Sequence, residues 1–443
     1  MSEQLVSEMR RLADAGDIQA FLRYAHEVHP SDLSDALAEL DSDVQLRLVQ
    51  LLPADVVSEA LAEMEDSEHP EALLAALKPE HAADIVEELE DDDAADLIAE
   101  LPPERARRIL AAVADRKDLE QLLRYDEETA GGKMTKGFVA VRDDATIADA
   151  LAEIRRQAEH IEDFYQVYVV AGTGQLLGIL PLQRVVTTEP TRPVGDVVEP
   201  VVVQVTPDLD QEEVARLMAR YNVAAVPVVD ALGRLLGRVT FDDVIDVVEA
   251  ESTEDLLRFG GVPAHEELEG GWIEAVRSRL PWLYVNLITA FAAGAVVYLF
   301  RGTIAQLVAL AVWMPIIAGM GGNAGTQALA VTVRRLSLGL VSRGEGLRVV
   351  GKELAVGMLN GVAVGLVVGV TAHFMGHGWG LGLVVLMAMW GNLIVAGTAG
   401  SIVPLALERL GADPAVASSI FVTTFTDICG FFLLLGLASW LLL

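Results

Sequence analysis

The chain ends in the stretch AVASSIFVTTFTDICGFFLLLGLASWLLL, residues 415–443. A helix of this length, rising by about 1.5 Å per residue, is long enough to cross a bilayer. Asp427 lies near its middle, and we expect it to be the only carboxylate of the chain at lipid depth. An acid there costs roughly 2.5–3.5 kcal/mol on insertion scales, so it indicates a functional site. The alternative is a structural acid that is kept protonated or is capped by Thr423, Thr424 or Thr426.

Four more apolar blocks precede this stretch, so the sequence predicts five membrane spans. Basic residues lie before the first block, between the second and third, and between the fourth and fifth. Because basic loops favour the cytoplasm, five spans place the N-terminus inside the cell and the C-terminus outside it. The expected spans are 281–300, 304–333, 350–374, 380–407 and 415–443.

Charge divides the 443 residues, whose formal net charge is −33, into two parts. Only nine Lys or Arg and six Asp or Glu lie from Gly271 onward, so the first 270 residues carry about −36 and the rest about +3. A strongly anionic front argues against nucleic acid or an acidic lipid surface as its partner and favours cations. A merely solvated acidic surface is the alternative that composition leaves open.

Cysteine content and the first residues bear on the compartment. Cys429 is the only cysteine, so no intrachain disulfide can form. The opening residues, MSEQLVSEMRRLADAG, are charged and have no apolar core, so they do not have the pattern of a signal peptide. We therefore expect the anionic front to stay in the cytoplasm.

Residues 1–128 have the pattern of short repeated helices. Four similar phrases, among them LPADVVSEALAEM and LKPEHAADIVEEL, each carry a proline at a helix start, where the missing N–H costs nothing. Their spacing of 23 to 26 residues predicts an all-α stack of helical repeats. The acidic run from Glu90 to Asp93 is expected to open one helix, either as simple capping or as an interface that needs counter-ions. The four prolines are Pro30, Pro53, Pro79 and Pro103.

Residues 129–248 repeat a strand–helix–strand plan. Expected strands at 139–141 and 167–170 flank one helix, and expected strands at 201–205 and 224–230 flank another. Glycines recur at an offset of 59 residues between the two halves, which predicts two similar α/β units that pack face to face. The recurring pairs are Gly174 with Gly233 and Gly178 with Gly237.

An acidic helix, FDDVIDVVEAESTEDLLRF, connects this part to the apolar blocks. It contains like charges four residues apart, which destabilise a helix unless a cation or a basic neighbour balances them. The alternative is a solvated acidic linker helix. A flexible segment with glycines at both ends, residues 260–271, follows it. The like-charged pairs are Asp242 with Asp246 and Glu251 with Asp255.

The second apolar block contains PIIAGMGGNAGTQ, residues 315–327. Glycines alone would indicate close helix packing. Asn323 and Gln327 add neutral oxygens at membrane depth, and the combination favours a pore lining. The residues expected to bind ions in the pore are Asp427, Asn323, Gln327, Gly322 and Gly325.

This set of groups suits a hard divalent cation. Mg²⁺ prefers oxygen ligands, keeps several waters and takes one or two carboxylates. A transition-metal carrier more often places His or Cys at its site. His373 and His377 are expected in an outer turn, and Cys429 on a different helix face from Asp427. The sequence therefore favours Mg²⁺, with Co²⁺ and Mn²⁺ left open.

The order of these segments resembles the MgtE family of magnesium channels and transporters. GMGGNAGTQ and TFTDICGFF carry the resemblance most specifically, and QLLGILPLQRVV with RLLGRVTFDDVI resembles the paired CBS module. The resemblance implies an inner-membrane homodimer with a pore on the two-fold axis and a Mg²⁺ site formed there by Asp427 of each copy. It implies an all-α helical-repeat N domain at 1–128, an α/β tandem CBS domain at 129–248, an acidic plug helix with a flexible segment at 249–271, and an α-helical membrane domain of five spans at 272–443.

The resemblance also implies regulatory Mg²⁺ sites among the acidic cytosolic faces. One departure from the family is Asn222, where members can carry an acid. The implicated residues are Asp243, Asp246, Glu254 and Asp255, with the acidic-run residues Asp91 and Asp92 and the weaker candidates Asp210 and Glu212.

Paired CBS modules often bind adenine nucleotides in the cleft between their repeats. Tyr168, Val226 and Pro227 lie where that family places adenine contacts. Where such a site often has a ribose-binding Asp, the first repeat has Gln183 and Arg184, and the second has Asp242 and Asp243. The sequence therefore leaves ATP binding open.

We expect a Mg²⁺-selective uptake channel that cytosolic Mg²⁺ closes, with a second copy, Mg²⁺ and membrane lipid as its partners. The sequence has no P-loop, HExxH or GxSxG motif, so we expect no enzyme. The rivals are a transporter of another divalent cation and a poreless membrane-anchored sensor of nucleotides or ions. Asn323, Gln327 and Asp427 count against the sensor, because an anchor needs none of them.

Overall fold

The computed structural model divides the chain into two compact units, Met1–Ala250 and Glu251–Leu443. Each unit has buried apolar clusters of its own. The structure describes residues 11, 18–64, 68–114, 116–158, 161, 165–263, 271–341, 344–411 and 418–443.

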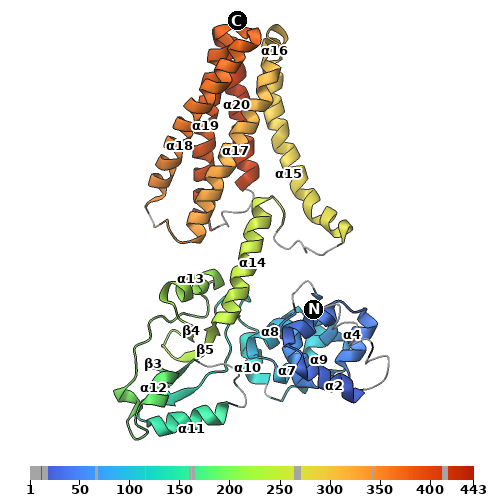
Figure 1. The fold of residues 1–443 in the computed structure, drawn as a ribbon, viewed down its shortest axis with the longest axis vertical. Helices are drawn as coiled ribbons and strands as arrows, with labels where there is room; N and C mark the ends of the chain where they lie inside the picture. Colours follow the sequence, from blue (N-terminus) through green and yellow to red (C-terminus); the bar gives the residue numbers. More distant parts are fainter. Residues whose placement is uncertain are drawn as a thin grey trace. The chain divides into compact units, whose positions relative to one another are not determined.

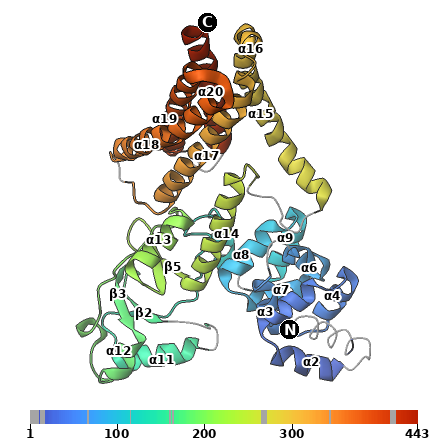
Figure 2. The same cartoon turned by 45° about the horizontal axis from the view of Figure 1, so that its top comes forward.

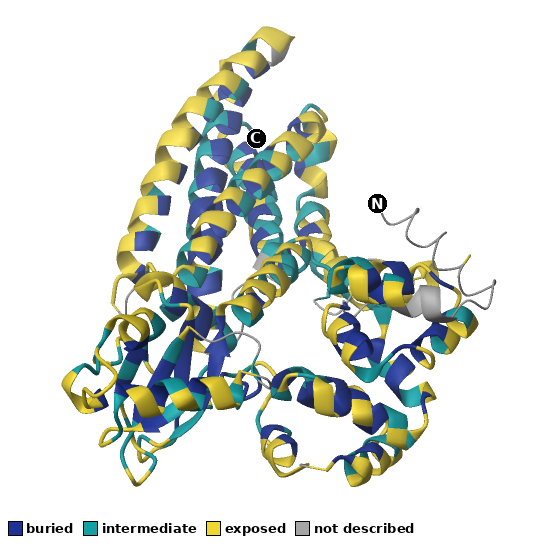
Figure 3. Cartoon of the chain, turned by 60° about the horizontal axis from the view of Figure 1, so that its bottom comes forward, coloured by how far each residue is buried: buried dark blue, intermediate teal, exposed yellow. Residues whose placement is uncertain are grey.

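Short helices make up the N-terminal part of the first unit (Figure 1), as the repeats predict. Three of them begin at Pro30, Pro79 and Pro103, and Pro53 is the N-cap of a fourth. Figure 3 shows these helices with buried residues along one side and exposed residues along the other, as stacked repeats require. The helices are α2 (Ile18–Glu27), α3 (Pro30–Ala38), α4 (Ser42–Val49), α5 (Ala54–Ala62), α6 (Pro70–Ala76), α7 (Pro79–Glu88), α8 (Asp91–Glu100), α9 (Pro103–Ala112) and α10 (Arg116–Leu122).

The second half of the first unit contains two small sheets. In the first sheet, β1 is parallel to β2, and β2 is antiparallel to β3. In the second, β4 and β5 are antiparallel. The elements are β1 (Ala140–Arg142), α11 (Ile147–Gln157), β2 (Gln166–Val170), β3 (Leu176–Pro181), α12 (Leu182–Thr187) and the 3₁₀ turn η2 (Val194–Asp196), then α13 (Gln211–Tyr221), β4 (Ala225–Val229) and β5 (Leu235–Thr240).

The strand expected at 201–205 was wrong. Within this stretch only Val205 joins the second sheet, where its N–H donates to the Pro227 carbonyl at 3.1 Å and its carbonyl accepts from Val229 at 2.8 Å. Pro200 and Pro207 flank the stretch, and neither has an N–H to donate to a ladder.

Long apolar helices make up the second unit (Figures 1 and 2). The acidic helix forms as predicted, and it contains the boundary between the two units. The elements are α14 (Phe241–Phe259), α15 (Trp272–Leu299), α16 (Arg301–Gln306), α17 (Leu310–Ser337), α18 (Gly346–Ala372), the π-helical turn η3 (His373–His377), α19 (Gly378–Arg409) and α20 (Ser418–Leu441).

Helix α19 is the packing centre of this unit. It carries many buried residues, whereas Ala293 is the one buried residue in the described part of α15. Glycines of α18 let that helix approach closely: a Cβ on Gly357 would lie 2.5 Å from the Leu393 carbonyl oxygen of α19. Helices α17, α18 and α20 all pack on α19, which places them around one shared core.

Four helices in the described residues are long and apolar enough to cross a membrane: α15, α18, α19 and α20. Helix α17 has 28 residues but interrupts its apolar sequence with several glycines, Asn323 and Gln327. The expected second block also divides, because residues 307–309 separate α16 from α17. The four helices agree with a multi-span protein, and the count of five stays a prediction.

Candidate ion-binding sites

Helices α17 and α20 carry the residues expected at the pore. Asn323 and Gln327 are exposed on one face of α17, and Asp427 is half-buried on α20. A Cβ on Gly322 would lie 3.8 Å from the methyl group of Thr423, which is one turn before Asp427. The structure therefore brings the Gly322 face of α17 next to the face of α20 that carries Asp427.

Gly325 has a different role from Gly322. It is buried, and a Cβ there would lie 2.5 Å from Cγ1 of Val422 on α20. Its carbonyl oxygen would lie 2.5 Å from a Cβ on Gly400 of α19. Gly325 thus permits the close approach of three helices, whereas the space beside Gly322 is open enough for a methyl group.

The threonines around Asp427 bond to their own helix. The hydroxyls of Thr423 and Thr424 donate to the carbonyls of Ser419 and Ile420, at 2.8 and 2.6 Å. Thr426 donates to the Thr423 carbonyl at 2.9 Å. Within the part of the chain that the structure describes, no group donates a hydrogen bond to the Asp427 carboxylate. Capping by these threonines is therefore not what holds the acid in place.

Asn392 of α19 is a buried polar residue that sequence reasoning missed. Its Nδ2 donates to the Ile317 carbonyl at 2.9 Å, and a Cβ on Gly321 or Gly430 would lie within 3 Å of this Nδ2. Asn392 is fully buried, and its Oδ1 has no hydrogen-bond partner among the described residues. It wedges between α17 and α20 where both helices have glycine.

Glu353 is a buried carboxylate within an apolar helix that sequence reasoning did not select, and the depth of Asp427 in the membrane stays a prediction. Glu353 belongs to α18, inside the candidate span Gly346–Met375, and is 6% exposed. The Lys352 ammonium lies 3.6 Å from its carboxylate. The signal in the sequence was an acid three residues inside the expected span 350–374, next to a lysine that suggested a solvated end.

In the first unit, the start of α8 lies beside the start of α14 and forms an acidic cluster. Asp92 is 5% exposed, and its Oδ1 has no hydrogen-bond partner among the described residues. Thr240 donates to Asp243 through its N–H at 3.2 Å and also through its hydroxyl. The cluster comprises Glu90, Asp92 and Asp93 with Asp242, Asp243 and Asp246.

Burial and mutual repulsion act on the acidic cluster together. Burial, followed by the charges of Asp243 and Asp93, raises the pKa of Asp92 well above its usual value. Burial, followed by Asp243 and Glu90, raises the pKa of Asp93 to about 8. Burial is also the main cause that raises the pKa of Asp243 and of Asp246. These carboxylates lie closer together than their charges favour without a counter-ion.

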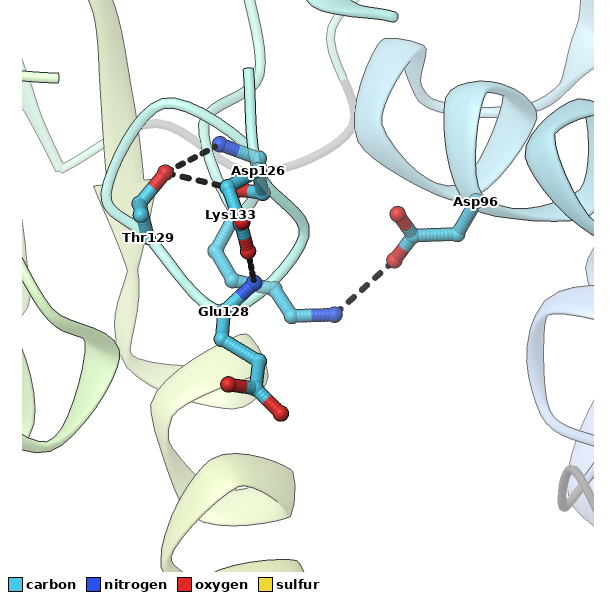
Figure 4. A network of polar contacts seen from close by, with 6 residues as sticks. Asp96, Asp126, Glu128, Thr129 and Lys133 are labelled. Atoms are coloured by element: carbon cyan, nitrogen blue, oxygen red, sulfur yellow. Dashed lines mark hydrogen bonds and ion pairs between the residues drawn. The ribbon is translucent and has the colours of Figure 1, made fainter. Parts of the chain in front are cut away.

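Two lysines already supply part of the opposite charge. Lys133 reaches from the 129–136 loop to Asp96 of α8 at 2.9 Å (Figure 4). Lys136 pairs with Asp118 at 2.5 Å, and its backbone N–H donates to Asp91 at 3.2 Å. The chain therefore joins its helical repeats to the α/β part through ammonium groups of its own.

Carboxylates alone do not complete a metal site here. In the ranges that the structure describes, no three His, Cys, Asp or Glu side chains are grouped to hold a metal ion. Mg²⁺ needs fewer protein ligands than this, because it keeps several of its waters. Pairs of carboxylates that bridge a hydrated cation are therefore the form of site that this cluster can offer.

The other expected regulatory residues have local partners. Glu254 pairs with Arg258, and the Ser337 hydroxyl donates to Asp255 at 3.5 Å within the second unit. Asp210 caps α13 by accepting from the N–H of Glu212 at 2.9 Å. Capping therefore accounts for Asp210 without a metal ion.

The expected nucleotide residues lie in the strands. Tyr168 of β2 is 1% exposed, and its hydroxyl is 3.2 Å from Nε2 of Gln166. Val226 and Pro227 are buried in β4, where Pro227 is paired with Arg238 of β5. Burial raises the pKa of Tyr168, and the nearby Arg238 acts in the opposite direction. Arg238 thus lies near both halves of the expected cleft, although sequence reasoning did not select it.

Asp427 lies within an apolar helix, and the acidic cluster of the first unit favours cations. These two features are typical of one class of protein, membrane transporters of divalent cations. Three family models match the chain. "Divalent cation transporter" covers residues 314–437, "MgtE intracellular N domain" covers 28–128, and "CBS domain" covers 130–188 and 194–250.

Full-length relatives define the family. A magnesium transporter MgtE of Thermus thermophilus is 35% identical, over 100% of this chain and 99% of its own length. One of Bacillus subtilis is 30% identical, over 99% of this chain and 97% of its own length. The chain belongs to the MgtE family, whose members are transporters and not enzymes.

Two solved structures resemble slightly more than half of the chain. The soluble part of a magnesium transporter is 28% identical, with a TM-score of 0.54 over 57% of this chain and 100% of that chain. The cytosolic domain of the Mg²⁺ channel MgtE in complex with ATP is 37% identical, with a TM-score of 0.52 over 55% of this chain and 99% of that chain. The predicted fold classes, a helical N domain followed by a tandem CBS pair, are confirmed.

Proposed function

We propose that the chain forms a homodimeric channel that takes up Mg²⁺ across the cell membrane. The observation that carries this proposal is the Asp427 carboxylate, half-buried in an apolar helix next to the polar face of α17. A charged or polar face on a membrane helix must meet protein, water or an ion instead of lipid. A water-filled path for a cation meets this requirement.

A second copy completes the path. One Asp427 offers one carboxylate, and hydrated Mg²⁺ takes one or two. Asn323 and Gln327 are exposed on a single copy. A two-fold axis beside α17 and α20 would cover these residues and bring two Asp427 carboxylates to one cation. Their repulsion would then depend on the ion between them.

Cytosolic Mg²⁺ closes the channel in this proposal. Ions that bridge Asp92 and Asp243 would relieve the repulsion in the acidic cluster and hold the start of α14 in place. The ligands assigned to this step are Asp243, Asp246, Glu254 and Asp255, with Asp91 and Asp92 from the acidic run and Asp210 and Glu212 in a weaker role. Mg²⁺ shifts the equilibrium only by its greater affinity for the closed state, and several weak sites would make the response steep.

The CBS cleft binds ATP in this proposal. Support comes from the ATP complex of the similar MgtE cytosolic domain and from Arg238 beside Tyr168. Five spans, with the basic residues on the inner side, place the N-terminus in the cytoplasm and the C-terminus outside. The anionic first unit would then face cytosolic Mg²⁺.

Mg²⁺ influx into vesicles that contain only the purified full-length chain tests the proposal. Asp427→Ala should abolish influx, and Asp427→Asn should lower it at least about tenfold, because charge attraction near 4 Å is worth about 4 kcal/mol at a protein surface and ~1.4 kcal/mol changes a rate tenfold. Glu408→Gln removes an exposed acid of α19 and should leave influx unchanged. Wild-type influx in Asp427→Ala would contradict the proposal, and influx of Co²⁺ or Mn²⁺ but not Mg²⁺ would reassign the ion.

A further inference from the structure

A cavity of about 240 Å³, with Glu353, Lys352, Gln327 and Asn360 among its lining residues, lies in the second unit, apart from Asp427. Helices α17 and α18 both pack on α19, and the cavity fills the groove that remains between them. Buried residues of α19, Leu393 and Gly397, contribute to its floor, while Gln327 and Asn360 are exposed at its mouth. One water needs only about 10–15 Å³, so the cavity has room for a cation with several waters.

Glu353 gives this cavity a negative charge. Its side chain is 7% exposed and lies among the lining residues. An ionised side chain within an apolar helix is costly unless it is paired, and in membrane proteins such groups mark ion pathways. The cavity therefore contains a buried anion that requires a counter-ion.

The present counter-ion is the neighbouring Lys352. Its Nζ is 3.6 Å from the Glu353 carboxylate, which is longer than a direct hydrogen bond, and its side chain is 55% exposed. The lysine stem is flexible and its ammonium is strongly hydrated, so the charge can move outward into water at little cost. Lys352 can thus leave the carboxylate when another cation arrives.

The neutral lining residues suit a hydrated hard cation. The side-chain amide oxygens of Gln327 and Asn360 can accept hydrogen bonds from bound water or ligate a cation directly. Mg²⁺ needs one or two carboxylates, and it retains much of its water shell. Together, Glu353 and the two amides make a donor set of this kind.

The position of the cavity gives it a place on the transport path. Glu353 is seven residues from the start of α18, about 10 Å along the helix, and Gln327 is ten residues from the end of α17, about 15 Å. Both lie toward the α17–α18 connection, the side that the basic residues assign to the cytoplasm. Gln327 also belongs to the expected pore face, so the cavity adjoins that face.

We propose that this cavity is a second, inner Mg²⁺ site, in which Glu353 binds the hydrated cation and Lys352 is the tethered counter-ion that the cation displaces. The inference rests on the proposed Mg²⁺ transport. It predicts opposite effects for two adjacent residues: removal of the Glu353 charge abolishes binding, and removal of the Lys352 charge strengthens it.

A cysteine reporter at the cavity tests the site in the full-length chain. Cys429→Ser removes the native thiol, and Val356→Cys places a reporter on the lining. Its rate of modification by a water-soluble methanethiosulfonate is measured with and without Mg²⁺. A concentration of twice the dissociation constant leaves about one third of the sites free, so modification should slow about threefold. A second reporter, Leu359→Cys, is 73% exposed on the same helix outside the lining and should show no protection.

The charges of Glu353 and Lys352 are then removed one at a time in the chain that carries the Val356→Cys reporter. Glu353→Gln should abolish protection, and Lys352→Met should give it at lower Mg²⁺. Glu345→Gln, at an exposed acid just before α18, should behave as the parent. If Glu353→Gln does not fold, Lys352→Met still decides, because unchanged or weaker protection in that variant overturns the proposal. Protection that persists in a folded Glu353→Gln variant overturns it as well.

The outcome separates this inference from the transport proposal. Protection that depends on Glu353 would support the inner site even if the wild-type chain shows no Mg²⁺ influx. Influx with no protection of Val356→Cys would leave transport standing and remove the inner site.

Discussion

The acidic cluster of the first unit and Asp427 of the second both place carboxylates at least partly away from water, but their surroundings differ. In the cluster, Asp92, Asp93 and Asp243 are crowded together, and burial and repulsion raise their pKa values. Asp427 stands without a hydrogen-bond donor among the described residues, and the threonines around it bond to their own helix. The acidic cluster therefore holds several carboxylates that repel one another, whereas the Asp427 site has a single carboxylate per copy.

Under the proposed function, this difference separates Mg²⁺ sensing in the first unit from conduction at Asp427. A crowded cluster gains much when a cation binds, so it can couple ion binding to the position of α8 against α14. A site with one carboxylate per copy binds a hydrated ion without removing its water, so the ion can leave again. The cluster is suited to change shape with Mg²⁺, whereas the frame around Asp427 is suited to stay fixed.

The largest expected effect comes from breaking the fixed frame at Gly325. A Cβ there would lie 2.5 Å from Val422, so Gly325→Val should separate α17 from α20 and lower Mg²⁺ influx at least about tenfold, since overpacking costs ~1–3 kcal/mol and ~1.4 kcal/mol is tenfold in rate. Gly294→Val on α15 is the control, because no other atom lies within 4 Å of a Cβ there. Vesicle influx at equal protein content measures both variants. Equal influx in the two would mean that α17 and α20 need no close packing.

The elements of the fold followed from local sequence signals. Prolines at helix starts predicted α3, α7 and α9, and the repeated glycine spacing predicted the two sheets. These signals act within a few residues, so one sequence suffices to read them. The expected strand at 201–205 failed because a strand also needs a partner distant in the sequence, and within this stretch only Val205 pairs with β4.

The candidate sites were only partly predictable, because they depend on contacts between distant segments. The pairing of Lys133 with Asp96 joins positions 37 residues apart, and no periodicity indicates it. The wedge of Asn392 against Gly321 and Gly430 likewise becomes visible only when α19 is packed between α17 and α20. Glu353 resembled a solvated helix end because it follows a lysine, whereas the structure buries it against α19.

An intermediate effect is expected when ligands are removed from the acidic cluster. Asp92→Asn with Asp243→Asn reduces the repulsion and also removes two Mg²⁺ ligands, and we expect the loss of ligands to dominate. Hydrogen bonds to charged groups are worth ~1.5–3 kcal/mol, so the Mg²⁺ midpoint for protection of the first unit from protease should rise about tenfold.

The matched control for these substitutions is a pair of exposed acids on the same unit. Asp143→Asn with Asp144→Asn removes the same charge away from the cluster, since both residues are exposed in the turn after β1. This variant should keep the wild-type midpoint. A wild-type midpoint in the cluster variant as well would identify the cluster as a solvated acidic surface and place sensing elsewhere.

The smallest effect is expected at Lys133. Its ammonium is a permanent cation beside the acidic cluster, so it offsets part of the repulsion that distinguishes the cluster from Asp427. Burial alone would lower the pKa of Lys133, but its pairing with Asp96 outweighs burial, so the net shift is upward and the side chain stays charged. Lys133→Met should remove one connection between the 129–136 loop and α8 that needs no Mg²⁺. In a metal chelator, protease should therefore cleave the first unit about two- to fivefold faster, since a partly exposed ion pair contributes ~0.5–1 kcal/mol. At saturating Mg²⁺ the bridging ions should hold the cluster and restore wild-type protection.

Lys117→Met, at an exposed lysine of α10, should change neither rate. Faster cleavage of Lys133→Met at both extremes of Mg²⁺ would show that the ion pair supports the fold itself, and that Mg²⁺ cannot take its place.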